Sequence, residues 1–388
     1  MVWLAAMNRS PSSHKARRPH RLALVTTEAR RAGAENILAA LATRIDRRRF
    51  DPTAIVLKSP GAGPSIAPDL RAAGVPLTTC RIDGPLSLPG GLLRLAEALR
   101  DARADIVNSH LFHANTAIAA WAALRGRRAP VVATHHIVER RPMGWRFRAD
   151  RLLDRVVSRH VAVSAAVADH QARRTGIDRS RFRIIHNGIP IPDRSDLPER
   201  GIARRRFRIP PDVLALGSLG RLDPQKGFLE FVPVMAELAR RFDTLHWYIG
   251  GDGPLRNELA NAIAAHGLDG RAHLVGFVRE PLLFYRALDA FLMPSRYEGF
   301  GLVAAEAMAG CCPVAVANVD SLPEIVTDGV TGLVFAPDGD VDRLADWLDA
   351  DDRRATQAER ARRTVEERFS VERMVAQYEA LFEEVLGE

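Results

Sequence analysis

Residues 290–309 read AFLMPSRYEGFGLVAAEAMA, and this single stretch has the order strand, loop, helix. Its apolar run Ala290–Met293 predicts a buried strand, and the alanine-rich segment Leu302–Ala309 predicts a helix. Successive parallel strands need such a helix between them, because the chain has to cross back over the sheet. The stretch therefore predicts an α/β fold built from strand–helix units.

The same alternation continues in both directions from this stretch. Short apolar runs alternate with segments whose apolar residues recur three and four positions apart. The predicted architecture is therefore two doubly wound Rossmann-like domains that face a cleft. The predicted strands are Leu22–Thr26, Ala54–Leu57, Ile106–Asn108, Val131–Thr134, Val161–Ser164, Arg183–Ile185, Val213–Leu219, Leu245–Ile249, Ala272–Gly276, Ala290–Met293, Pro313–Ala317 and Gly332–Phe335.

Breaks in this alternation divide the chain. The stretch 191–212 is rich in proline and charge and has no apolar period, which predicts a linker. Residues 352–386 have a helical pattern throughout and could pack back across the domain junction. The predicted parts are a basic N-terminal tail (1–20), a first domain (21–190), the linker (191–212), a second domain (213–370) and a C-terminal helix (371–388).

The composition is that of a globular protein in a reducing compartment. Of the 388 residues, 47% are hydrophobic and 6% aromatic, which excludes a disordered chain and a fibrous repeat. Cys80, Cys311 and Cys312 cannot form a disulfide framework, since two of the three are adjacent. No apolar stretch reaches the length of a membrane span. We expect a cytoplasmic protein that at most touches the inner face of a membrane.

Charge is distributed unevenly along the chain. Residues 1–200 carry 34 Lys and Arg against 17 Asp and Glu, a balance of +17, whereas residues 201–388 carry 21 against 30, a balance of −9. This difference favours an anionic partner for the first half. A general preference of the source organism for arginine explains the same numbers, so both interpretations stay open at this point.

Glu298 and Glu306 are the first candidates for chemistry. Gly299 and Gly301 let the backbone approach a ligand closely, and the free N–H groups at the start of the following helix attract a phosphate or sugar oxygen. The alternative is an ordinary capping acid and a solvated helix residue. A dinucleotide pattern, Gly299-x-Gly301-x-x-Ala304, is also present, but such a site normally follows the first strand of its domain and not the fourth.

The stretch 217–227, GSLGRLDPQKG, provides the second candidate site, again between a strand and a helix. Arg221 and Lys226 suit a diphosphate, Arg through its planar fork and Lys as a point charge. The alternative is a solvated pair beside a turn. In the first half, His110, His136 and His186 follow strands, but no ligand spacing recurs that would make a zinc site.

Together these motifs resemble those of the retaining glycosyltransferases of the GT-B fold, in the family 4 class. The resemblance covers almost the whole chain from about residue 21. It rests on Gly220-Arg-Leu-Asp-Pro-Gln-Lys-Gly227, Gly250-Gly-Asp-Gly-Pro254, the E-x7-E spacing of Glu298 and Glu306, Leu322-Pro-Glu-Ile-Val, Asp328-Gly-Val-Thr-Gly-Leu333, Asn108-Ser-His110, Thr134-His-His136 and Ile185-His-Asn-Gly188.

The resemblance implies transfer of a sugar from a nucleotide-diphosphate sugar, the co-substrate, without a metal or another cofactor. Arg221 and Lys226 would neutralise the departing diphosphate. Glu298 would bind the donor sugar, and Glu306 the ribose hydroxyls. Further residues implied at the donor are the backbone of Phe300, Gly301 and Leu302, with Gly33 of the first loop, and the base region Gly276, Phe277, Val278 and Arg279.

The first domain would bind the acceptor, a glycan, lipid-linked glycan or glycolipid of anionic character. His136 matches the family's histidine near the reacting centre, and the other implied acceptor-side residues are His110 and Asn187. The implied catalytic set is Glu298, His136, Arg221 and Lys226. The chain departs from the family pattern in two places, since the first loop keeps only Gly33 of a glycine pair, and Asp320-Ser321 replaces another pair.

Rival interpretations remain. A sugar-nucleotide epimerase or a phosphorylase could use the same fold, although the pair of glutamates speaks against both. A nucleic-acid-binding protein could use the basic half, but that half lacks interleaved aromatic residues, so we expect no nucleic-acid partner. Residues 148–159 suggest a helix with apolar and arginine stripes that begins near Trp145 and Phe147. Such a helix suits either an anionic membrane surface or ordinary packing on a sheet.

Overall fold

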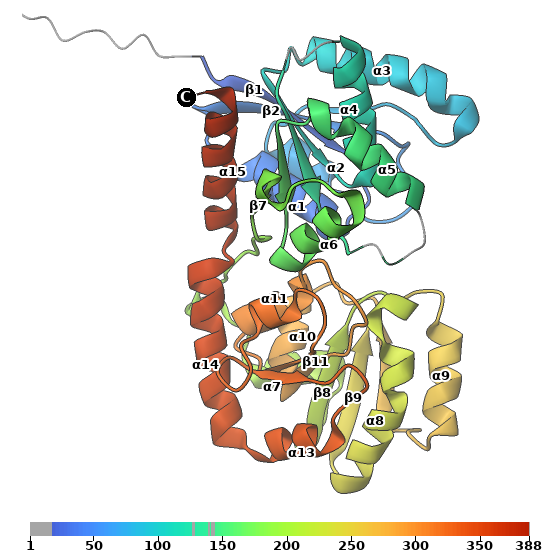
Figure 1. Cartoon of the computed structure of the whole chain (residues 1–388). Coiled ribbons are helices and arrows are strands. Elements are labelled where there is room, and N and C mark those ends of the chain that lie inside the picture. Colours follow the sequence, from blue (N-terminus) through green and yellow to red (C-terminus); the bar gives the residue numbers. More distant parts are fainter. Residues whose placement is uncertain (1–17, 126–128, 139, 141–143, 388) are drawn as a thin grey trace, which may run out of the picture.

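The computed structural model describes residues 18–125, 129–138, 140 and 144–387. These residues form two α/β domains, one above the other in Figure 1, and each has a parallel sheet between helices. The fold class predicted from the sequence is confirmed. Most of the predicted tail, residues 1–17, lies outside the described residues. No helix in the described ranges has the length and apolar character needed to span a bilayer.

The first domain has a seven-stranded sheet in the order β3-β2-β1-β4-β5-β6-β7. Neighbouring strands pair in parallel, and the order reverses between β1 and β4. Its strands are β1 His20–Thr26, β2 Phe50–Val56, β3 Leu77–Thr79, β4 Ile106–His110, β5 Val131–His135, β6 Arg159–Ala162 and β7 Phe182–Ile184. Its helices are α1 Gly33–Arg44, α2 Ala67–Ala72, α3 Leu88–Asp101, α4 Phe112–Arg125, α5 Gly144–Leu153 and α6 Ala165–Thr175.

The second domain has a six-stranded sheet in the order β10-β9-β8-β11-β12-β13, which reverses between β8 and β11. Its strands are β8 Leu214–Leu219, β9 Leu245–Gly250, β10 Ala272–Gly276, β11 Ala290–Met293, β12 Val314–Ala317 and β13 Leu333–Phe335. Its helices are α7 Arg200–Phe207, α8 Phe228–Arg241, α9 Arg256–Ala265, α10 Pro281–Ala287, α11 Leu302–Ala309, α12 Leu322–Ile325, α13 Val341–Asp349 and α14 Asp351–Arg368.

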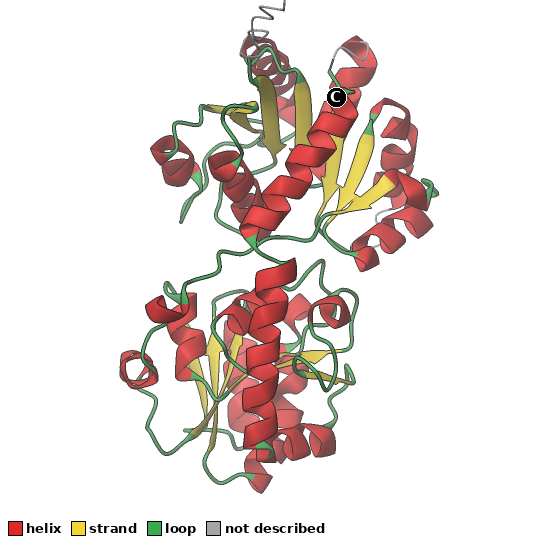
Figure 2. Cartoon of the chain, turned by 90° about the vertical axis from the view of Figure 1, so that its left-hand side faces the viewer, coloured by secondary structure: helices red, strands yellow, loops and turns green. Residues whose placement is uncertain are grey.

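The last helix, α15 Val371–Leu386, returns to the first domain. Figure 2 shows α14 beside one domain and α15 beside the other. The sequence predicted one helical segment here, but the helix breaks at Phe369, and the Ser370 side chain caps α15 by accepting from Arg373 N at 3.3 Å. The apolar face of α15 is buried with α1, and Arg49 pairs with Glu379 at 2.7 Å.

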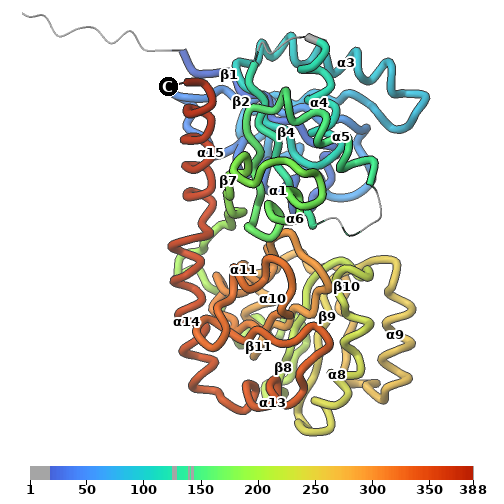
Figure 3. Tube along the Cα trace, viewed as in Figure 1, coloured from blue at the N-terminus to red at the C-terminus, as the bar shows by residue number. Residues whose placement is uncertain are grey.

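The chain crosses between the domains twice, and the two crossings lie side by side (Figure 3). Ile189 N donates to Phe369 O at 2.9 Å, and Val371 N donates to Ile189 O at 3.0 Å. A Cβ on Gly188 would lie 2.5 Å from Val371 Cα, so only glycine allows this close approach. The crossings therefore form one hydrogen-bonded strap.

Two local predictions need correction. The predicted linker contains helix α7, which is held by charge and not by an apolar stripe, because the buried Arg204 side chain donates to Asp289 Oδ2 at 2.6 Å and to Ala287 O at 3.2 Å. The predicted helix over 148–159 begins near Trp145 as expected but is shorter than predicted. Instead α5 ends at Leu153, a single 3-10 turn follows at Asp154–Val156, and Arg159 begins β6.

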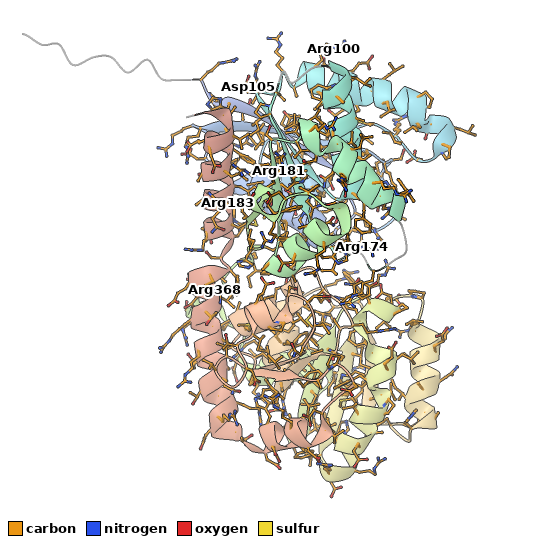
Figure 4. All side chains as sticks on the ribbon, in the orientation of Figure 1. Arg100, Asp105, Arg174, Arg181, Arg183 and Arg368 are labelled. Atoms are coloured by element: carbon orange, nitrogen blue, oxygen red, sulfur yellow. The ribbon has the colours of Figure 1, made fainter. Side chains whose placement is uncertain are left out.

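Several arginines of the first domain, including Arg181 and Arg183, which Figure 4 labels, form ion pairs within the fold. Arg21 binds Asp105 at 2.7 Å, Arg181 binds Asp154 at 2.9 Å, and Arg183 binds a residue of α15, Glu384, at 3.3 Å. Part of the positive balance of this domain is therefore structural.

Candidate active site

The predicted donor residues gather where the order of the second sheet reverses. In doubly wound sheets, ligands bind outside the carboxyl ends of the two strands at this reversal. Here those strands are β8, which leads to Arg221 and Lys226, and β11, which leads to Glu298. The topology therefore places the two motifs next to each other.

Glu298 is a buried carboxylate with well-defined partners. Its Oε1 accepts from Lys226 Nζ at 2.5 Å and from Ser295 Oγ at 2.9 Å, and its backbone N donates to Asp320 Oδ2 at 3.1 Å. Only 8% of its side chain and 17% of that of Lys226 are exposed, which makes this a desolvated ion pair. Removing two charges from water costs free energy, so such a pair is expected where it binds a ligand or fixes a loop.

Hydrogen bonds fix the loops that carry this pair. The 3-10 turn Pro224–Lys226 begins at Asp223, whose carboxylate accepts from Gln225 N at 3.1 Å. The Gln225 side chain donates to Tyr297 O at 3.2 Å, and Gln225 O accepts from Arg296 N at 2.8 Å. Arg221 pairs with Asp223 at 2.9 Å, and 58% of its side chain is exposed. Lys226 is thus fixed in place, whereas Arg221 is open to a ligand.

The glycine-rich loop touches the first domain. A Cβ on Gly299 would lie 1.8 Å from His136 O, and Ser164 Oγ donates to Gly299 O at 2.7 Å. A Cβ on Gly33, at the start of α1, would lie 3.2 Å from Leu302 Cδ1. The structure therefore brings Gly33 and His136 together with the donor-side loop.

His136 ends a chain of three hydrogen-bonded side chains. Asn108 Nδ2 donates to Val132 O at 3.1 Å, so Asn108 Oδ1 accepts from His110 Nε2 at 2.7 Å. His110 Nδ1 then accepts from His136 Nε2 at 2.9 Å, which leaves His136 Nδ1 without a proton. Burial lowers the pKa of His110 to about 3 and that of His136 well below its usual value. Both rings are therefore neutral.

Glu306 lies on α11 beside Tyr285. Tyr285 Oη donates to Glu306 Oε2 at 3.0 Å, and burial raises the pKa of Glu306 to about 7. A pocket of about 290 Å³ borders Glu306, Tyr285, Pro281 and Leu282. A carboxylate at the edge of such a pocket can accept hydrogen bonds from vicinal hydroxyls.

The base region Gly276–Arg279 directly follows β10. Gly276 has a left-handed φ of 73°, and its carbonyl accepts from Gly251 N at 2.7 Å, which joins this turn to the turn after β9. Phe277 is 67% exposed. Val278 and Arg279 line a separate pocket, which they share with the end of α7. Pro281 and Leu282, which follow this region in the sequence, line the pocket beside Glu306, whereas residues 276–279 do not.

The buried Phe300 and Asn187 lie at the domain junction. The Phe300 ring packs against Phe369 and His186, with centroids 5.5 and 5.9 Å apart. Asn187 Oδ1 is buried without a hydrogen-bond partner in the described ranges. Among the described residues, no hydrogen bond joins Asn187 to His136. The acceptor-side role of Asn187 therefore stays a prediction.

Two acids escaped the sequence-based assignment of roles. Glu324 of α12 accepts from Ala165 N and Ala166 N at 2.9 and 2.8 Å, so it caps α6 of the other domain. Asp320, noted only as a departure from the family pattern, has a φ of 42° and binds Arg140 across the cleft at 2.8 Å. The backbone of Asp320 is left-handed, a conformation that favours glycine. A glycine at this position would therefore have marked the turn in the sequence, but an aspartate does not. Among the residues described, no cluster of three acids, histidines or cysteines is arranged to hold a metal ion.

Two protein-family models match the chain, one to each domain. The model described as Glycosyl transferases group 1 matches residues 199–364, and the model described as Glycosyltransferase Family 4 matches residues 31–191.

Known proteins are similar over much of the chain. The D-inositol 3-phosphate glycosyltransferase of Actinosynnema mirum is 29% identical over 293 residues, which cover 67% of this chain and 66% of that protein. The lipopolysaccharide core biosynthesis mannosyltransferase LpsB of Rhizobium meliloti is 30% identical over 259 residues, which cover 64% of this chain and 70% of that protein. The chain thus spans about two thirds of the length of these relatives.

Solved structures share the fold over nearly their whole length. The structure of Anabaena HepE in complex with UDP superposes with a TM-score of 0.80 at 21% sequence identity. The matched region covers 94% of this chain and 99% of HepE. A glycosyltransferase from Rickettsia africae has a TM-score of 0.80 at 20% identity, with coverages of 95% and 99%.

Proposed function

The chain belongs to the glycosyltransferases of group 1 and family 4, and from that premise we propose that it is a retaining, metal-independent enzyme that uses a nucleotide-diphosphate sugar. The observation that carries the proposal is the buried pair of Lys226 and Glu298 at the reversal point of the second sheet. The solved structure of HepE, which has the same fold, is a complex with UDP.

The donor would lie across the loops after β8 and β11. Arg221 and Lys226 would balance the charge of the departing diphosphate, and the free N–H groups of Phe300, Gly301 and Leu302 at the start of α11 would bind its oxygens. Glu298 would accept hydrogen bonds from the sugar, and Glu306 from the ribose. Two cations and a helix end then supply the positive potential that Mg²⁺ provides in other enzymes.

His136 would face the reacting centre from the acceptor side. Because its Nε2–H donates to His110 Nδ1, its own Nδ1 carries no proton and can accept a hydrogen bond from a sugar hydroxyl. A neutral imidazole adds no positive charge that would compete with Lys226 for the diphosphate. The ring would therefore orient the sugar and leave the charge balance to the second domain.

A donor panel tests this proposal. Binding of UDP-, GDP- and ADP-sugars is measured by thermal shift, because a ligand that binds the folded state raises its melting temperature. We expect one nucleotide class to stabilise the protein and the transferred sugar to keep its anomeric configuration, as read by NMR of the product. Absence of a shift with every nucleotide sugar, or an inverted product, contradicts the proposal.

The acceptor would be a glycan, lipid-linked glycan or glycolipid, and the enzyme would work at the cytoplasmic face of a membrane. Its three cysteines are free thiols, which fits a reducing compartment. Four leucines of the 3-10 turn Pro85–Ser87 and the start of α3, at the edge of the first domain far from the second (Figure 1), are exposed. They are Leu86, Leu88, Leu92 and Leu93, with exposed fractions of 100%, 44%, 42% and 67%.

Sedimentation with vesicles tests the membrane contact. Vesicles of neutral phosphatidylcholine are compared with vesicles that also contain phosphatidylglycerol, at low and high salt. Binding to the anionic vesicles that is lost in Leu86→Asp and Leu93→Asp supports the leucine surface. Binding that is lost instead on changing Arg148 and Arg151 to Gln favours α5, and no binding at low salt leaves a soluble acceptor.

A further inference from the structure

The loop between β11 and α11 has its carbonyl oxygens and its N–H groups in opposite states. Three successive carbonyls, those of Glu298, Gly299 and Phe300, accept hydrogen bonds from serine hydroxyls. The N–H groups of Gly299, Phe300 and Gly301 donate to no other residue in the described ranges, although all three residues are buried. Because a buried backbone N–H is nearly always paired, the loop presents three donors that a ligand can complete.

Two serines from different domains hold these carbonyls. Ser321, at the start of α12, donates to Phe300 O at 3.0 Å and also lies 3.3 Å from Glu298 O. Ser164, which precedes α6 of the first domain, donates to Gly299 O at 2.7 Å. Both serines are fully buried. In a trans peptide the C=O group and the N–H group of the next residue point in opposite directions, so each bonded carbonyl fixes the direction of the N–H that follows it.

Asp320 holds the first peptide group of the same loop. Its Oδ2 accepts from Glu298 N at 3.1 Å and its Oδ1 accepts from Arg140 Nη2 at 2.8 Å, so one carboxylate contacts both domains. Its backbone has a φ of 42° in a tight turn, which is closed by a hydrogen bond of 3.0 Å from Leu322 N to Val319 O. A non-glycine residue keeps this conformation only where its surroundings hold it, and here the two side-chain contacts do so.

We propose that Ser164, Asp320 and Ser321 are positioning residues for the nucleotide-diphosphate sugar. They touch no reacting atom themselves, but they fix the peptide groups of residues 298–301, whose N–H groups bind the oxygens of the diphosphate. Because Ser164 belongs to the first domain, the N–H group of Phe300 has a fixed direction only while the two domains are in contact. The proposal rests on the proposed function, since it needs a donor at this loop, and it adds the residues that prepare the loop for that donor.

Asp320→Gly tests the proposal without straining the backbone, since glycine readily adopts a left-handed φ. The variant and the wild type are titrated by calorimetry with UDP, GDP and ADP and with the three bare nucleosides, and their melting temperatures are compared. We expect the diphosphate to bind about tenfold more weakly and the nucleoside to bind unchanged. Ser321→Ala, which releases two carbonyls of the loop, is expected to have the same effect.

Asp320→Asn is the conservative variant that separates positioning from packing. Its amide oxygen can still accept from Glu298 N, so most of the affinity for the diphosphate should return. Wild-type affinity in both Asp320→Gly and Ser321→Ala, or equal losses for diphosphate and nucleoside, overturns the proposal.

Ser164→Ala tests the contribution of the first domain. Ser164 Oγ also caps α6 by accepting from Val167 N at 3.1 Å, so this variant loses stability as well. The control is Asp340→Ala, because Asp340 caps α13 by accepting from Arg343 N at 3.2 Å, and α13 lies at the opposite end of the second domain from α11 (Figure 1). We expect Ser164→Ala to bind the diphosphate about tenfold more weakly, and Ser164→Thr, which keeps the hydroxyl, to bind it as the wild type does. If Ser164→Ala binds the diphosphate as well as the control does, the role of the first domain is refuted.

Binding by the wild type separates failure of this proposal from failure of the proposed function. A wild type that binds none of the three nucleoside diphosphates refutes the proposed function. A wild type that binds one of them, with variants that bind it equally well, refutes only the positioning residues.

Discussion

The reversal points of the two sheets hold polar groups in opposite states. In the second domain, the Glu298 carboxylate already accepts from Lys226 and Ser295. In the first domain, Glu35 and Asp150 have no partner from another residue in the described ranges. In the proposed function, the fixed ion pair awaits the diphosphate, which is common to all nucleotide-diphosphate sugars, whereas the polar side chains at the first reversal point keep their hydrogen-bonding capacity unused. The same topology thus supports one prepared site and one adaptable site.

Glu298→Gln attacks the prepared site directly. The amide keeps the shape of the side chain but removes the charge that Lys226 faces, so turnover is expected to fall about a hundredfold or more. Steady-state rates at saturating donor, together with circular dichroism, measure this. A folded variant with the wild-type rate would remove Glu298 from the site, and a loss of about 1 kcal/mol of stability without loss of rate would make it a simple cap.

Lys226→Ala and Arg221→Ala test whether the prepared site is prepared for a diphosphate. Each substitution is expected to weaken the binding of a nucleoside diphosphate tenfold or more and to leave the binding of the bare nucleoside nearly unchanged. The reason is that a charge-assisted contact contributes about 1.5–3 kcal/mol to binding. Calorimetric titration of both ligands gives the comparison. Arg296→Ala is the control, because Arg296 is an exposed cation that pairs with Glu230 beside the same loop. Equal losses for both ligands would move these cations away from the diphosphate.

His110→Phe tests the connection between the two sites. The ring centroids of His110 and His136 lie 5.1 Å apart, and phenylalanine keeps this stacking. A phenylalanine ring, however, cannot accept the hydrogen bond from His136 Nε2. With His136 no longer held in one tautomer, kcat is expected to fall about tenfold while the KM for the donor stays the same. His110→Gln offers an acceptor oxygen and should recover part of the rate. An equal loss in both variants would indicate a packing role only.

Glu306→Gln is expected to have the smallest effect on the free protein. The pKa of Glu306 is about 7 in the fold, above its ordinary value of 4.5, so the carboxylate lowers the free energy of unfolding as pH rises from 4.5 towards 7. At pH 8 the amide variant should be more stable, on the order of 1 kcal/mol once partial exposure is allowed for, and near pH 4 equally stable. Denaturant unfolding at both pH values measures this, and equal stability at pH 8 would contradict the buried-charge account.

The sequence predicted most of the fold because apolar runs fix buried strands. Strand β3 was missed, since Leu77–Thr79 has only three residues, and α7 was missed because Arg204 and Asp289 hold it across 85 positions. The two failures have different causes, because a strand of three residues is too short to show a period, whereas α7 depends on a distant contact. A contact between distant residues leaves no period in the local pattern.

The same reason divides the candidate sites. Arg221, Lys226 and Glu298 each sit in a short strand–loop–helix stretch that a reader can recognise. The pocket at the reversal point of the first sheet instead joins Thr27, Lys58, Asp150 and Gln171, which come from separate loops and helices along nearly 150 residues. No spacing predicts such a set, and only the folded chain brings it together.

The paired crossings at Ile189 and Ser370 also decide how the molecule can move. Two parallel connections that share hydrogen bonds resist torsion about the long axis of the molecule, while still permitting rotation about an axis at the strap. The domains should therefore open and close by a hinge motion about the strap, without twisting relative to each other. One consequence is that a single cut by a protease in the α7 segment leaves the C-terminal fragment attached to the first domain, because α15 of that fragment packs against α1.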